Sequence, residues 1–212
     1  MTDNDDLLAL PAEDWAKAIL ELVLTRESEP LANHSIRSYL FARLRAEHEG
    51  MLAEVDDRLL FAATVLHDLG LRTGPVGPAR FEVEGADQAA EFLRANGFDE
   101  RSVDVVWEAI ALHTSDGIAE RRGPIAYLTR SGVGMDFGRG VDFVTDAQAE
   151  RVHAAHPRFD MATALVDVIA AQCRETPSKG PRYSLPGELA RERSAGPSTE
   201  LERGTTASRW GS

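Results

Sequence analysis

The chain has 212 residues, a formal net charge of −12 and a single cysteine, Cys173. This length predicts one domain with at most an appendage, and the acidic charge argues against nucleic-acid binding because phosphate backbones repel it. One thiol excludes an internal disulfide and a cysteine-based zinc site, which fits a reducing cytoplasm. With no signal-peptide pattern and no apolar run near the ~20 residues that span a membrane, we expect a cytoplasmic protein without membrane contact.

Helical patterning recurs along residues 1–173. Apolar residues at helical spacing predict helices over 11–24 and 31–50, the second capped by Asn33 or Ser35 and closed at Gly50. A third helix is predicted over 56–70, with acidic residues at its start and Gly70 at its end. Further helices are predicted over 85–97, 99–115, 123–132, 145–157 and 158–173. No alternating strand pattern of useful length occurs, so we predict an all-α domain over residues 1–173.

Residues 174–212 differ in composition from the rest of the chain. They are rich in Pro, Gly, Ser, Thr and Arg and contain few aliphatic residues. Such a segment buries too little apolar surface to offset the entropy lost on ordering. We therefore expect residues 174–212 to form a disordered tail.

Three histidines lie in apolar helical stretches. His67 and Asp68 directly follow the apolar run 61–66, and His34 and His113 lie in two other predicted helices. Burying such groups costs several kcal/mol unless they are paired or bound to a metal. Each histidine alone is more often a satisfied structural residue, but three of them together with a carboxylate favour a shared site for zinc, iron or manganese.

A further ligand candidate is Asp136 in the segment SGVGMDFGRG. The neighbouring Gly132, Gly134 and Gly138 let the backbone fold tightly around it. The local sequence is equally consistent with a turn residue that hydrogen-bonds its own backbone.

Five sequence motifs follow one another over about residues 10–173: NHSIRSYLFARL, VLHDLGL, FEVEGADQAAEFL, VWEAIALHTSDGIA and GVGMDFG. This pattern resembles the HD-domain metalloenzyme superfamily and, within it, the cyanamide hydratase-like HD family. The resemblance implies that His34, His67, Asp68 and Asp136 bind a divalent metal, with Zn²⁺ preferred over Fe²⁺ and Mn²⁺. It also implies that His113 lines the pocket as a catalytic residue or holds a second metal.

Other residues beside these motifs are candidates for contact with a substrate. Asn33 could bond the substrate or orient a ligand. Arg37 could pair with an acid of the pocket, although a plain salt bridge is an equal interpretation. Glu84 is either an acid at a helix start or a group that handles a proton at the pocket mouth. Phe81 and Arg72 complete the predicted substrate-binding residues.

Two enzymatic hypotheses follow from metal-activated water. The first is hydration of a small nitrile, with cyanamide giving urea, in which His113 or a pocket acid protonates the developing nitrogen anion. The second is an HD phosphohydrolase acting on a nucleotide or another phosphate ester. Many such enzymes resemble this chain at the HD pair but continue as HDIGK, whereas this chain reads HDLGLRTG, with Arg72 and Arg80 as the nearby cations. This departure favours the first hypothesis.

Two other classes are less favoured. A di-iron oxygenase needs more ligands than the four matched positions and His113 provide. A catalytically silent sensor module is disfavoured because all four matched ligands are present. We expect a small-molecule substrate, and the sequence is compatible with a homo-oligomer.

Overall fold

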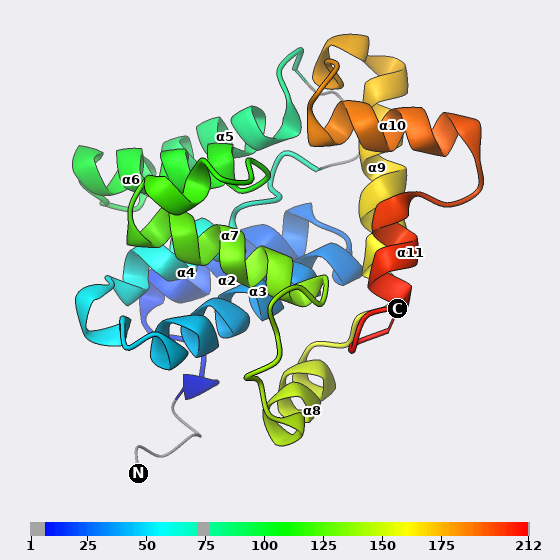
Figure 1. Cartoon of the computed structure of the whole chain (residues 1–212). Coiled ribbons are helices and arrows are strands. Elements are labelled where there is room, and N and C mark those ends of the chain that lie inside the picture. Colours follow the sequence, from blue (N-terminus) through cyan, green and yellow to red (C-terminus); the bar gives the residue numbers. More distant parts are fainter. Residues whose placement is uncertain (1–6, 72–76, 212) are drawn as a thin grey trace.

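The computed structural model describes residues 7–71 and 77–211, and within these residues all the regular structure is helical (Figure 1). The α-helices are α2 Asp14–Arg26, α3 Glu29–His48, α4 Asp57–Val65, α5 Phe81–Ala95, α6 Glu100–Leu112, α7 Pro124–Asp136, α8 Asp146–Ala155, α9 Met161–Glu175, α10 Leu185–Ala195 and α11 Glu200–Thr206. The all-α prediction is confirmed. None of the helices in the described residues combines the length and the apolar character needed to cross a membrane.

Helix α3 is the central element of the bundle. It packs against α7, α4 and α9, and most of its side chains from Leu31 to Ala46 are buried. The helix begins earlier than predicted, because Ser28 occupies the extended N-cap position and Pro30 fits the first turn. Asn33 and Ser35 therefore lie inside the helix and do not cap it.

The crossing of α3 and α7 is unusually close. A Cβ atom at Gly132 would overlap with the backbone carbonyl of Ser38, so only glycine allows this approach. Helix α7 also runs on to Asp136, beyond the predicted end at residue 132. Gly132 thus serves helix packing, whereas Gly138 lies in the turn after α7 with a φ of 84°, which favours glycine.

The His67–Asp68 pair lies in the turn that follows α4, because this helix ends at Val65 and does not continue to Gly70. The turn is pressed against the first turn of α5. A Cβ atom at Gly70 would overlap with the carbonyl oxygen of Phe81, and one at Gly85 would lie 3.0 Å from the backbone nitrogen of Gly70. The two glycines let these backbones touch, which fixes the position of the pair.

The C-terminal segment is folded, in contrast to the disorder expected for residues 174–212. Helices α10 and α11 pack against α9 at one side of the molecule (Figure 1). The few aliphatic residues of the segment share one face, so that Leu185, Leu189 and Leu201 join an apolar cluster with Leu165 and Ile169. Composition alone missed this arrangement, because the cluster uses few residues but concentrates them against α9.

The end of the chain is tied to the end of α7. The indole Nε1 of Trp210 donates a hydrogen bond of 2.6 Å to the carbonyl of Met135, and its ring stacks on Phe41. Arg209 donates to the carbonyls of Val141 and Val144. These contacts hold the chain end beside the residue that precedes Asp136.

We predict that Gly70→Ala destabilises the protein, because the added methyl group must push the HD turn away from α5. Overpacking of this kind should cost about 2 kcal/mol or more and lower Tm by roughly 5 °C or more. The matched control is Gly204→Ala in α11, where a Cβ atom meets nothing within 4 Å. Thermal unfolding of both variants checks this, and equal Tm values would contradict the proposed close contact.

Candidate metal centre

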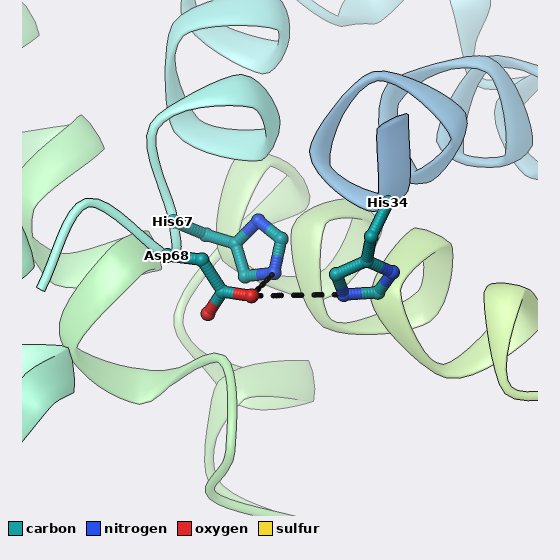
Figure 2. Close-up of side chains that lie close together, drawn as sticks. All are labelled: His34, His67 and Asp68. Atoms are coloured by element: carbon teal, nitrogen blue, oxygen red, sulfur yellow. Dashed lines mark ion pairs between the residues drawn. The ribbon is translucent and has the colours of Figure 1, made fainter. Parts of the chain in front are cut away.

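Three buried side chains converge on one point: His34 from α3, and His67 and Asp68 from the turn after α4 (Figure 2). Asp68 Oδ2 lies 3.8 Å from His34 Nε2 and 3.3 Å from His67 Nε2. One potential ligand atom from each residue lies within 4.8 Å of the other two. The side chains are 0–1 % exposed, so water does not solvate them from outside.

The hydrogen bonds of the two imidazoles aim their lone pairs at this point. The Nδ1 of His34 lies 2.6 Å from Asp136 Oδ2, and the Nδ1 of His67 lies 2.7 Å from the carbonyl of Thr64. Because both acceptors require a proton on Nδ1, each Nε2 carries the free lone pair. Neutral imidazoles oriented in this way are typical metal ligands.

The converging atoms lie within ion-pair distance of one another but make no hydrogen bond among the described residues. His34 Nε2, His67 Nε2 and both carboxylate oxygens of Asp68 are buried without a hydrogen bond. Such orphaned groups cost about 1–3 kcal/mol each, and more when charged, and native proteins rarely keep several together. A divalent cation at the centre would satisfy all of them, so the residues present fit a metal.

His113, the C-cap residue of α6, adds a third imidazole. Its Nδ1 lies 2.6 Å from the carbonyl of Ile110, so its Nε2 also presents a lone pair, 3.8 Å from Asp68 Oδ1. The ring lies edge-on to His67, and the ring of Phe81 packs on it. His113 is therefore placed to complete the ligand set or to act beside it.

The carboxylate and two of the imidazoles have the charge states that a divalent ion needs. Burial lowers the pKa of His34, and burial together with nearby His67 lowers the pKa of His113 to about 4. Burial alone would raise the pKa of Asp68, but His67 outweighs it and holds this pKa below its usual range. The same pairing with Asp68 raises the pKa of His67 against the effect of burial. At neutral pH, the structure thus offers neutral imidazoles from His34 and His113 beside a carboxylate, whereas His67 would release a proton on binding an ion.

Asp136 does not join this group. Its Oδ1 accepts hydrogen bonds from Arg37 Nε at 2.7 Å and Arg158 Nη1 at 3.1 Å, and its Oδ2 accepts from Arg37 Nη2 at 2.8 Å and contacts His34 Nδ1. These four contacts occupy the lone-pair sites of the carboxylate. Against the prediction of a fourth ligand, the structure places Asp136 behind His34, where it orients the ring.

Two other predicted residues also lie behind the ligands. Arg37 is fully buried and donates to the carbonyls of His156 and Pro157 as well as to Asp136. Asn33 donates to the same carbonyl of Pro157, at 3.0 Å. Neither side chain lines the cavity at the ligands.

Glu82, and not Glu84, is the acid of α5 that is linked to His113. Glu84 pairs with Lys179 at 2.7 Å and accepts hydrogen bonds from the backbone of Gly77 and Ala79, which fastens the segment before α5. Glu82 is fully buried and accepts a 2.7 Å hydrogen bond from Thr114, the residue after His113. The predicted position Arg72 lies outside the described residues.

A cavity of about 100 Å³ opens on the converging side chains. Phe81, which the sequence suggests as a substrate-binding residue, lines it. Its apolar wall is formed by Phe81, Val133, Phe137, Leu165, Leu185 and Leu201, and its polar wall by the ligand candidates, His113, Thr114, Asp116, Arg130 and Arg139. The two arginines were not singled out from the sequence, because they are far from the HD pair along the chain.

Glu27 is another residue that the sequence did not single out. It follows α2 in an ordinary polar stretch, yet it is only 9 % exposed and accepts a hydrogen bond from Ser35 at 3.1 Å. Burial and the nearby negative charge of Asp68 raise the pKa of Glu27 to about 8. The site therefore has a largely protonated carboxyl group close behind it at neutral pH.

The helical bundle brings two imidazoles and a carboxylate together in a buried cluster whose converging atoms make no hydrogen bond within the described part of the chain. This arrangement is typical of metal-binding helical domains. Residues 31–169, more than half of the chain, match the HD domain family, and the protein belongs to that family. HD domains are typically metal-dependent hydrolytic enzymes that bind divalent metals. No curated protein matches the chain significantly.

We predict different outcomes for the two aspartates near His34. Asp68→Asn should abolish binding of one divalent ion, whereas Asp136→Asn should keep the stoichiometry and weaken the affinity about 10–100-fold, as expected for a group that orients a ligand. Metal titration with elemental analysis checks this. Asp116→Asn, which alters a cavity acid outside the cluster, serves as the matched control and should bind metal normally. Complete loss of metal in Asp136→Asn, in a folded protein, would make Asp136 a ligand after all.

A pH prediction follows from the raised pKa of Glu27. The folded state holds this proton between pH 4.5 and about 8, while the unfolded state has lost it. The stability that the protonated form contributes is therefore present below pH 4.5 and is lost as the pH rises to about 8, by roughly 1.4 kcal/mol per unit. Glu27→Gln has no such dependence and should become the more stable protein as the pH rises. Unfolding of both proteins in chelator across this range tests it, and parallel pH profiles would exclude the effect.

Proposed function

We propose that this protein is a metal-dependent enzyme that adds water to a small nitrile, with cyanamide converted to urea as the leading reaction. The observation that carries the proposal is the cavity of about 100 Å³, with a largely apolar wall, directly over the ligand candidates. Sites for drug-sized ligands occupy about 300–1,000 Å³, so the cavity volume favours a substrate smaller than a nucleotide. The cyanamide hydratase-like phrases of the sequence point to the same substrate class.

Zn²⁺ is the preferred ion because its sites combine imidazole and carboxylate ligands, with Fe²⁺ and Mn²⁺ as alternatives. When bound, such an ion supplies activated water near pH 7. His34, His67 and Asp68 would hold it, and His113 would either join them or exchange a proton with the substrate through Nε2. The Nδ1 contact to Ile110 keeps this Nε2 directed at the reacting groups.

The apolar wall has two tasks in this mechanism. Phe81 packs against His113 and fixes the imidazole plane, so that its nitrogen faces the cavity. Phe81 and Phe137 also limit the number of water molecules beside the reacting atoms. Fewer competing waters strengthen the electrostatic interactions on which polarisation of a nitrile depends.

A second candidate is hydrolysis of a small phosphate ester, which Arg130 and Arg139 in the cavity wall favour. Phosphoryl transfer needs cations that stabilise the developing charge. The charge of Arg130 is largely offset by its ion pair with Asp116. Among the described residues that line the cavity, Arg139 is then the one arginine whose charge no ion pair offsets, so the nitrile remains the leading proposal.

We predict that the metal-loaded protein forms urea from cyanamide and that His67→Ala abolishes this reaction. The assay runs beside a panel of small phosphate monoesters, with urea and inorganic phosphate as readouts. Phosphate release without urea would overturn the nitrile proposal in favour of the second candidate.

Arg139→Gln separates the two chemistries further. Loss of a cation that contacts a phosphate should lower kcat/KM for the ester about 10-fold or more, whereas hydration of a neutral nitrile should change little. Steady-state kinetics with both substrates measures this. A comparable loss for cyanamide would contradict the assignment of a neutral substrate.

A further inference from the structure

We propose that Leu185 and Leu201, from the two C-terminal helices, set the size limit of the molecules that reach the metal centre. The inference rests on the proposed function and names the residues that give the enzyme its preference for small substrates. Leu185 is the first residue of α10, and Leu201 lies in the first turn of α11. Both lie beyond residue 169, where the match to the HD domain ends.

The two leucines stand between two hollows. The inner cavity of about 100 Å³ contains the ligand candidates, and an outer hollow of about 490 Å³ lies over α10 and α11. Leu185 and Leu201 line both, together with Phe137 and Arg139. Shortening either leucine would therefore connect the small inner space with a much larger one.

The wall is held firmly in place. Arg193 of α10 pairs with Asp167 of α9 and with Glu202 of α11, each at 2.8 Å, and so joins the three helices. The hydrogen bond from Trp210 to Met135 then fastens the segment after α11 to α7. A wall with such anchors cannot easily move aside for a larger molecule, so it can discriminate by size.

The same arrangement provides a matched control residue. Leu189 lies one turn after Leu185 on α10, is 3 % exposed, and belongs to the same apolar cluster. It lines the outer hollow but not the inner cavity. Leu189→Ala therefore removes the same atoms from the same helix without touching the inner wall.

The test uses metal-binding probes of two sizes and needs no turnover. The protein is loaded with Co²⁺, whose visible absorption changes when a further ligand binds, and is titrated with imidazole and with benzimidazole. Leu185→Ala and Leu201→Ala should strengthen benzimidazole binding about 10-fold while imidazole changes less than about threefold, because pocket walls discriminate by such factors per group removed. Leu201→Phe should weaken binding of both probes by narrowing the cavity.

Leu189→Ala should leave the ratio of the two affinities as in the unaltered protein. An unchanged ratio in both alanine variants would overturn the proposal, and so would an equal change in Leu189→Ala, since general loosening of α10 would then explain it. The outcome is separate from the proposed function. A protein that shows the size effect but forms no urea would contradict nitrile hydration alone, and one that forms urea without the size effect would contradict only the role of the leucines.

Discussion

The buried carboxylate of Asp136 is the interaction on which the rest of the site depends. It joins the ring of His34, the guanidinium of Arg37 and that of Arg158, and so connects α3, the end of α7 and the segment before α9. A buried charge is tolerable only when it is paired and hydrogen-bonded, and here the two arginines provide that. Nearby positive charge and the hydrogen bond to His34 outweigh burial and hold the pKa of Asp136 below its usual range. The carboxylate thereby fixes which nitrogen of His34 points at the metal position.

The opposite side of the cluster is fixed by backbone contact instead of charge. Gly70 and Gly85 bring the turn with His67 and Asp68 against the start of α5, so the ligands cannot withdraw from each other without opening this contact. A rigid frame of this kind explains how unsatisfied polar atoms persist in the interior. The stability of the surrounding bundle offsets their cost and holds the ligand candidates in the geometry that a metal needs.

Much of this structure could be predicted from sequence, and the exceptions have a common cause. Helical periodicity located the bundle, and the apolar surroundings of His34, His67 and His113 indicated a shared site. The sequence suggested that Asp136 is a metal ligand, because local patterns do not show where its hydrogen bonds come from. Its carboxylate accepts them from Arg37 and Arg158, 99 and 22 residues away along the chain. Local composition equally could not place Glu27 beside the ligands. Both of these errors at the site concern a partner chosen by long-range packing, which local patterns do not encode.

The C-terminal segment shows how composition can mislead about function as well as order. Its helices contain few aliphatic residues, but Leu185 and Leu201 meet the cavity wall, and charged residues such as Arg193 hold them there. The matched HD domain supplies the ligand candidates, while part of the wall comes from residues beyond it. Ligands alone do not choose among substrates, because metal-activated water attacks carbon and phosphorus alike. The preference must then come from the wall, and here the wall includes the segment outside the family match.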